Sequence, residues 1–202
     1  KRNHKTFKES YKKYELNLKK KIDIANYNIL DIGSGSGENA LFLSNLLPNA
    51  KIITCELFED GNINLCNKLK NGNIKNINLY KGNVLEFLDL IDINLTFNEI
   101  WILFPDPWPK IRHHKRRLIN YSFLLKIYKY LKSESKVMIA TDSDSYTQSI
   151  LLSIYNAQKI YSWENQRLGD WDYNSLNLPK TKFSEKSKKS NRKSMFFKLK
   201  KI

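Results

Sequence analysis

Two carboxylates and a run of glycines occur where two consecutive apolar segments end. Asp31 lies within the apolar stretch 29–32, the run Gly33-Ser34-Gly35-Ser36-Gly37 follows it, and Glu56 follows a second apolar stretch, 51–55. Glycines let the chain turn sharply and let a ligand approach the backbone without Cβ clashes. At the carboxyl end of a first strand, such a turn is where α/β sheets bind nucleotides. We therefore expect a nucleotide-like cofactor at this turn.

The acids favour one cofactor over another. A phosphate-binding P-loop is excluded because no Gly-Lys-Ser/Thr follows, whereas the dinucleotide fingerprint stays open because Gly35 to Ala40 fits its G-x-G-x-x-A form. An acid at Asp31 suits a cationic amino-acid group and would repel a pyrophosphate at the same helix N-terminus. Glu56, 23 residues after Gly33, is placed to accept hydrogen bonds from both ribose hydroxyls. Together these features favour S-adenosylmethionine over NAD. Asn83 follows the third apolar run, and its side-chain amide can both donate hydrogen bonds to the adenine and accept them from it.

A second constellation follows the fourth apolar run. Phe104-Pro105-Asp106-Pro107-Trp108-Pro109-Lys110 leads directly into Ile111-Arg112-His113-His114-Lys115-Arg116-Arg117. The prolines on either side of Asp106 predict a fixed backbone, with the residue before each proline extended. Asp106 is thus expected to be a positioned carboxylate that faces the cofactor. The cationic residues after it suit phosphates, which Lys and Arg contact without reading sequence.

The segment F-P-D-P-W-x-K-x-R-H-x-K-R-R, present here nearly whole, resembles the signature of bacterial tRNA (guanine-N7)-methyltransferases. The resemblance runs from about Ile29 to the C-terminus and includes Ala140-Thr141-Asp142 and Thr181-Lys182-Phe183. It implies an S-adenosylmethionine-dependent enzyme that methylates N7 of guanine 46 in the variable loop of tRNA. Some members of this family are fused to a second methyltransferase, and the resemblance makes such a fusion an expectation for the full-length chain.

The resemblance and the residue chemistry together give three sets of site residues. The expected cofactor-binding residues are Asp31, Gly33, Gly35, Glu56, Asn83 and Asp106, the last also being catalytic. The expected substrate contacts are Lys110, Asp142, Thr181, Lys182, Phe183 and Ser184. The RNA backbone is expected to meet Arg112, Lys115, Arg116 and Arg117. The family usually has Asp at the place of Asn83 and Glu at the place of Ser184, so both positions depart from its pattern.

Several of these residues keep a second interpretation. Trp108, beside prolines, either packs within the protein or stacks on a base. Asp142 either contacts substrate or caps the following helix. His113 and His114 lack a partner at nucleophile or metal spacing, so a surface role is expected. Neither cysteine lies in a cluster with metal-ligand spacing, and no metal is expected.

Short apolar runs alternate with helix-period stretches from Tyr27 onward, which is typical of a parallel sheet covered by helices. Strands are predicted at 29–32, 51–55, 77–80, 99–104, 136–141, 159–164 and 194–200. Helices are predicted at 37–47, 59–71, 84–91, 117–132 and 144–157, with 165–194 irregular. This order matches a Rossmann-like seven-stranded methyltransferase sheet, mostly parallel, with helices on both faces and an antiparallel C-terminal edge hairpin.

The basic surplus is concentrated in three segments. The net charge of +15 arises from +7 in 1–21, +5 in 110–117 and +9 in 180–202, which leaves −6 for the remainder. Such clustering indicates a polyanionic partner, here tRNA, although the terminal runs could instead be solvated arms. No apolar run is long enough to span a bilayer, so we expect a soluble, cytoplasmic protein. We expect one methyltransferase domain over 27–202, preceded by a basic segment, 1–26, that is truncated or belongs to a longer chain.

Two other functions are compatible with the sequence. One is an S-adenosylmethionine-dependent N-methyltransferase that acts on an exocyclic amine or a protein glutamine, which carries a related Asn/Asp-Pro-Pro-Tyr/Phe motif at this place in the fold. The motif of those enzymes differs from the Asp106-Pro107-Trp108 of this chain, and the basic run that follows favours an RNA substrate over a protein substrate. The other is an RNA-binding module that has lost catalysis, motivated by Asn83 and Ser184. Equilibrium binding of S-adenosylmethionine separates these two.

Overall fold

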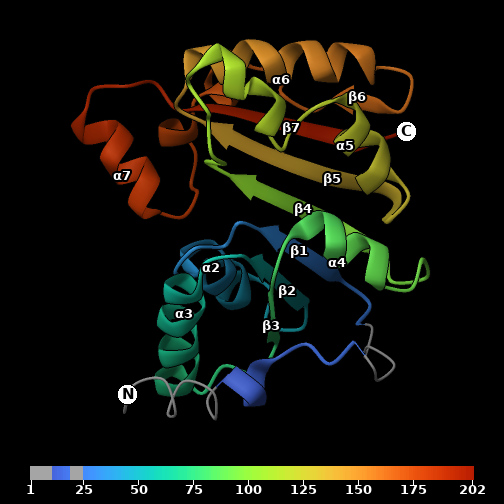
Figure 1. The fold of residues 1–202 in the computed structure, drawn as a ribbon, viewed down its shortest axis with the longest axis vertical. Coiled ribbons are helices and arrows are strands. Elements are labelled where there is room, and N and C mark those ends of the chain that lie inside the picture. The colour runs from blue at the N-terminus through green and yellow to red at the C-terminus, as the bar shows by residue number, and fades with distance from the viewer. Residues whose placement is uncertain (1–10, 19–24) are drawn as a thin grey trace. The chain divides into compact units, whose positions relative to one another are not determined.

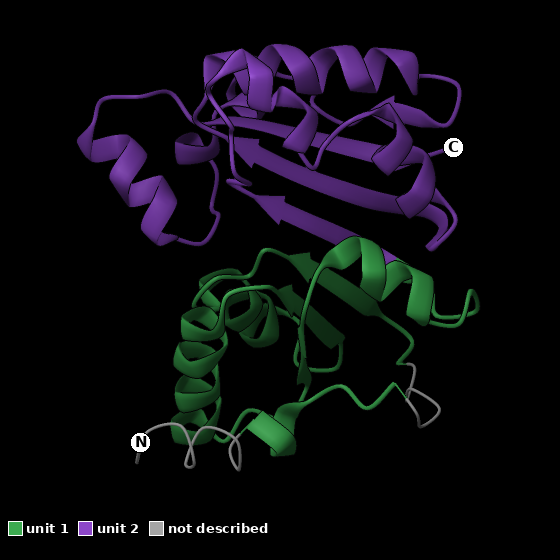
Figure 2. Cartoon of the chain, viewed as in Figure 1, with its two compact units in different colours: residues 1–97 green, residues 98–202 purple. Residues whose placement is uncertain are grey.

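The computed structural model describes residues 11–18 and 25–202. The rest of the predicted basic segment 1–26 lies outside the described residues. The chain divides into two compact units, residues 1–97 and 98–202 (Figure 2). Seven strands hydrogen-bond in the order β3-β2-β1-β4-β5-β7-β6 (Figure 1). The predicted Rossmann-like fold is therefore confirmed, while its description as one domain stays a prediction.

The first unit alternates three strands with three helices. In chain order these are β1 (Asn28–Ile32), α2 (Glu38–Leu46), β2 (Lys51–Glu56), α3 (Glu59–Gly72), β3 (Ile77–Lys81) and α4 (Val84–Leu90). The strands run in parallel, with Ile29 opposite Ile52 and Ile52 opposite Ile77. Every residue of β1 is buried, as expected for a parallel strand covered on both faces. Asn73 ends α3 in a left-handed conformation with φ 49°, a common helix stop.

The second unit begins within β4 (Phe97–Leu103) and contains the antiparallel edge. It continues through η1 (Ile111–Arg116), α5 (Tyr121–Tyr128), β5 (Leu131–Thr141), α6 (Asp144–Asn156), β6 (Tyr161–Trp163), η2 (Leu168–Trp171), η3 (Tyr173–Ser175), α7 (Lys182–Lys189) and β7 (Met195–Lys201). Strand β7 pairs antiparallel with both β5 and β6. The predicted edge hairpin is thus confirmed, and its inward side chains Phe197 and Leu199 are completely buried.

Some predictions of local structure in this unit are wrong. The helix predicted at 117–132 spans only Tyr121–Tyr128, and β5, predicted at 136–141, already begins at Leu131. The helix starts late because the Asn120 side chain accepts a hydrogen bond from the amide of Phe123 and caps it there. The stretch predicted as irregular, 165–194, contains a further α-helix, α7. That helix is polar, and Phe183 is its only apolar residue, so it lacks the apolar stripe by which helices are recognised.

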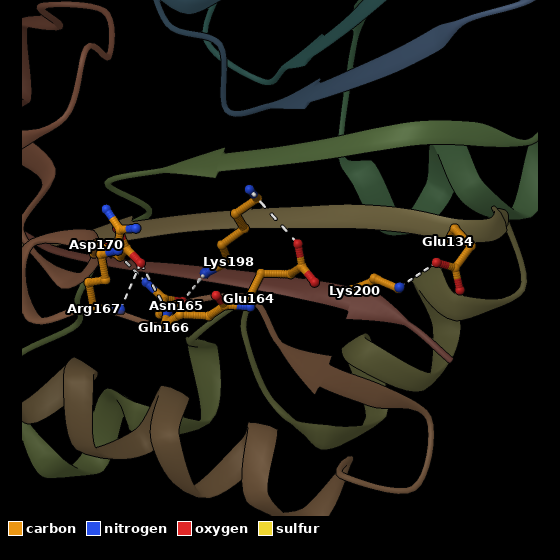
Figure 3. A network of polar contacts seen from close by, with 8 residues as sticks. All are labelled: Glu134, Glu164, Asn165, Gln166, Arg167, Asp170, Lys198 and Lys200. Atoms are coloured by element: carbon orange, nitrogen blue, oxygen red, sulfur yellow. Dashed lines mark hydrogen bonds and ion pairs between the residues drawn. The ribbon is translucent and has the colours of Figure 1, made fainter.

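A polar network ties the segment after β6 to β7 (Figure 3). The Asn165 side chain accepts a hydrogen bond from the amide of Lys198 at 2.7 Å and donates one to the carbonyl of Phe196 at 3.0 Å. The Asp170 carboxylate accepts from the amides of Gln166 and Arg167 at 2.9 Å each, and these bonds lower the pKa of Asp170. The Asn165 side chain is thereby hydrogen-bonded to the backbone of β7. These bonds fix the start of the loop that leads towards α7.

Candidate active site

One candidate site, in the first unit, is the turn between β1 and α2. Gly33, Gly35 and Gly37 have φ values of 69°, 53° and 79°, a region that residues with a Cβ seldom adopt. At Gly37 space adds a second constraint, because a Cβ there would lie 2.3 Å from the Leu65 Cδ1 atom. The three alternating glycines are therefore required by backbone conformation, and the turn leaves its backbone open to a ligand.

Asp31 is buried beneath this turn, with 1% of its surface exposed. Its Oδ1 atom accepts a hydrogen bond from the Asn39 side chain at 2.9 Å, whereas its Oδ2 atom has no hydrogen-bond partner within the described part of the chain. Burial raises the pKa of Asp31 to about 7, and the nearby Glu56 carboxylate adds to the effect, while the Asn39 hydrogen bond opposes it. A buried oxygen without a partner is costly, and a cationic ligand group would remove that cost.

Glu56 is held at the same turn by two backbone amides. One carboxylate oxygen accepts from Gly35 at 2.8 Å and the other from Phe58 at 2.7 Å. A carboxylate has about four acceptor positions, so two remain for other donors, such as the pair of hydroxyls on a ribose. Helix α3 approaches closely here, because a Cβ on Gly61 would lie 2.7 Å from the Gly35 carbonyl oxygen. Sequence reasoning missed Gly61, which lies outside any motif, and Asn39, which occupies a variable position of the G-x-G-x-x-A form.

Asn83 lies just after β3 and is the N-cap of α4. Its side-chain oxygen accepts from the amide of Leu85 at 2.8 Å. An Asp at this place could cap the helix equally well, so the departure from the family pattern leaves the local structure intact. Asp31, Glu56 and Asn83 therefore occupy the carboxyl ends of β1, β2 and β3, the edge at which parallel α/β sheets bind nucleotides.

A second candidate site, in the second unit, is the loop after β4 that carries Asp106. Asp106 is exposed, and the residues two positions before and after it have unusual backbones. Phe104 has a φ value of 53°, so the expectation of an extended residue before each proline that flanks Asp106 is wrong at Phe104. Trp108, which precedes Pro109, has a φ value of 44° and is not extended either. Such conformations cost about 1–3 kcal/mol each and persist where the surroundings enforce them.

Aromatic packing supplies that enforcement. The ring of Phe104 lies edge-on to that of Tyr173, with 5.1 Å between centroids. The ring of Trp108 lies against Arg116, whose guanidinium carbon is 4.9 Å from the ring centroid, and edge-on to His113 at 5.9 Å. Trp108 is thus engaged within the loop, in agreement with the packing interpretation.

The cationic residues that follow divide into two groups. Lys110, Arg112, Lys115 and Arg116 are exposed. Arg117 is only 4% exposed, and its side chain makes five hydrogen bonds to other residues of this unit. Its burial is at odds with the expected contact to the RNA backbone, because its donors are already used inside the protein.

Asp142 directly follows β5 and forms an ion pair with Arg192 at 2.9 Å. It does not cap α6, whose N-cap residue is Ser143, so the capping interpretation of Asp142 is wrong. Arg192 was not predicted as a site residue, because the sequence places it in a terminal basic run without a motif.

The segment from Thr181 to Ser184 starts α7 with a capping box. The Thr181 hydroxyl accepts from the amide of Ser184 at 3.0 Å, and the Ser184 hydroxyl accepts from the amide of Thr181 at 2.9 Å. In the usual box Glu takes the second position, so Ser184 keeps the structural part of that role. Both residues are buried, whereas Lys182 and Phe183 are exposed. The exposed pair is therefore what this segment offers a substrate.

Comparison with known proteins assigns the chain to a family. The family model Methyltransf_4, described as "Putative methyltransferase", matches residues 25–197. The tRNA (guanine-N(7)-)-methyltransferase of Buchnera aphidicola is 35% identical over 86% of this chain and 72% of its own length. The chain belongs to the tRNA (guanine-N7)-methyltransferase family. The enzyme of that name from Bartonella quintana is 32% identical over 81% of this chain and 70% of its own.

The fold has a wider distribution than the family. An rRNA methylase from Streptococcus thermophilus superposes with a TM-score of 0.58 at 13% identity, covering 98% of this chain and 95% of its own. That likeness concerns the fold alone. Among the described residues of this family member, no group of three or more His, Cys, Asp or Glu side chains could hold a metal ion. No helix in the described part is long and apolar enough to cross a membrane.

Proposed function

We propose that this chain transfers the methyl group of S-adenosylmethionine to N7 of a guanine in tRNA, at position 46 of the variable loop. The observation that carries the proposal is the exposed Asp106 carboxylate, fixed between Pro105 and Pro107 and followed by exposed cations, in a chain of this family. The family supplies the reaction class, and the residues supply the roles below.

The described residues fit S-adenosylmethionine on their own chemistry. The buried Oδ2 of Asp31 without a partner suits a cationic amino group, and the two remaining acceptor positions of Glu56 suit the ribose hydroxyls. Asn83, whose oxygen already caps α4, has an amide NH₂ that would donate to an adenine nitrogen. When bound, the cofactor supplies a methyl group already activated by its positive sulfur.

Asp106 has two tasks in this proposal. The Watson–Crick edge of guanine carries the N1–H and amino donors, and one carboxylate can accept both hydrogen bonds. This grip orients the ring so that the lone pair of N7 faces the methyl group, and no proton must leave before attack. The negative charge of Asp106 also stabilises the purine as it becomes cationic.

The exposed cations hold the polyanion. Arg112, Lys115 and Arg116 are proposed to meet phosphates, and Lys110, Asp142, Lys182 and Phe183 to contact the modified nucleotide. Arg117 is omitted from the phosphate contacts because of its burial. Thr181 and Ser184 are proposed to support this contact indirectly, by fixing the start of α7. Work in the cytoplasm and fusion to a second methyltransferase in a longer chain stay predictions.

The proposal is tested by incubating tRNA with labelled S-adenosylmethionine and analysing the released nucleosides. Wild-type protein should yield labelled 7-methylguanosine. Asp106→Ala should keep tRNA affinity but lose on the order of 10²-fold in turnover, as when a positioned electrostatic group is removed. Asp106→Asn should be similarly poor, because its amide sets a donor against donors. A label in an exocyclic N-methyl nucleoside would favour the amine-directed alternative, and RNA binding without cofactor binding would favour a lapsed enzyme.

A further inference from the structure

We propose that Arg117 is a positioning residue that holds the loop of Asp106 in its reactive conformation. The inference rests on the catalytic role proposed for Asp106. It assigns to Arg117 a structural contact with the loop in place of a contact with RNA.

One guanidinium group joins the loop to α6. Its Nε atom donates to the carbonyl oxygen of Pro107, the residue after Asp106, at 2.9 Å. Its two terminal nitrogens donate to the carbonyl and the hydroxyl of Ser145 at 2.9 Å each, and also to the hydroxyl of Ser149. Because the guanidinium is planar and its donors have fixed directions, these contacts fix the Pro107 carbonyl relative to the first turns of α6.

The same side chain also braces the loop from within. One terminal nitrogen lies 2.9 Å from Nε2 of His114, and since Arg has no acceptor, the imidazole must accept this bond. The guanidinium carbon lies 5.0 Å from the centroid of the Tyr146 ring. Tyr146 in turn accepts from the amide of Ile119 at 2.9 Å. Arg117 thus contacts the loop directly at Pro107 and is linked through Tyr146 to its end near α5.

The loop needs such a donor. Prolines at 105, 107 and 109 have no N–H group, so this stretch has few donors of its own with which to fix its conformation. The unfavourable φ values at Phe104 and Trp108 require external support. The Arg117 guanidinium, which is itself hydrogen-bonded to Ser145 and Ser149 of α6, donates to the Pro107 carbonyl and provides this support.

The position of the Arg117 charge supports a role in holding the conformation of the Asp106 loop. None of the five acceptors of Arg117 is a carboxylate. The group also lies at the N-terminal end of α6, where the helix dipole disfavours a cation. A buried cation in such a place is tolerated when its hydrogen bonds are satisfied, and here those bonds are the ones that hold the loop.

The test is Arg117→Lys, which keeps the charge but loses the planar fork. Single-turnover methyl transfer should slow by about 10-fold or more, since small misplacements of a catalytic group have large effects. The affinity for tRNA and its salt dependence should not change. Arg167→Lys, the same exchange at an exposed residue of this unit, is the matched control and should react at the wild-type rate. Ser149→Ala removes one acceptor and should give a smaller loss in the same direction, which keeps the test valid if Arg117→Lys folds poorly.

A double-mutant cycle distinguishes positioning from general damage. If Arg117 acts through Asp106, Asp106→Asn with Arg117→Lys should react within about 3-fold of Asp106→Asn alone. A loss that multiplies in full, or a wild-type rate for Arg117→Lys, would overturn the role of Arg117 only. A wild-type rate for Asp106→Asn alone would overturn the proposed chemistry, and with it the need for positioning.

Discussion

Asp31 links the candidate cofactor site to the stability of the fold. Its pKa is raised from 3.8 to about 7 by burial. At about 1.4 kcal/mol per pH unit, holding this carboxylate ionised costs the ligand-free fold roughly 4 kcal/mol above pH 7. The stabilising contribution of the protonated group is fully present below pH 3.8 and is lost as the pH rises through about 7. Stability should therefore decrease with rising pH across this window.

The perturbation is Asp31→Asn, which removes the charge and keeps the shape. Urea unfolding of the ligand-free protein at a series of pH values gives the free energy of unfolding for both forms. Between pH 5 and pH 8 the wild type should lose about 3 kcal/mol relative to Asp31→Asn, since the slope acts over about two pH units of that range. Asp89→Asn, at an exposed carboxylate, is the control and should follow the wild type. Parallel curves for wild type and Asp31→Asn would refute the reasoning.

Three further predictions concern the rest of the site. Glu56→Ala should weaken S-adenosylmethionine binding by about 1.5–3 kcal/mol, the scale of hydrogen bonds to a charged group, whereas calorimetry of Glu59→Ala should show wild-type affinity. Replacing both Lys115 and Arg116 by Ala should weaken tRNA binding and reduce the slope of log affinity against log salt by about two; an unchanged slope would make these residues a solvated face. Ser184→Ala should lower the free energy of unfolding by about 1 kcal/mol through loss of the capping box, and equal urea midpoints for Ala and wild type would argue against the box.

The sequence predicted those parts of the molecule that depend on local pattern. The strand ending at Ile32, the glycine turn and α2 follow from an apolar run, three glycines and a helix period, and the structure has them within one or two residues. Asp31, Glu56 and Asn83 were placed correctly at strand ends for the same reason. Their local roles, such as the capping of α4 by Asn83, were visible only in the structure.

Arg117 shows why the rest could not be predicted. In the sequence it is the last of five cations between 110 and 117, and nothing local distinguishes it from Arg116. Its burial depends on Ser145 and Ser149, which lie 28 and 32 positions further along the chain. Helix α7 escaped prediction for a related reason, because it begins at a capping box of Thr181 and Ser184 and has no apolar stripe.

The central claim is that the methyl group goes to N7 of guanine 46 in tRNA. The most direct measurement compares two tRNAs that differ by one atom, one with guanine and one with 7-deazaguanine at position 46. Both should bind with equal affinity, and only the guanine form should accept a labelled methyl group, recovered as 7-methylguanosine. Methylation of the 7-deazaguanine tRNA at that nucleotide would contradict the claim and would indicate that an exocyclic amine accepts the methyl group.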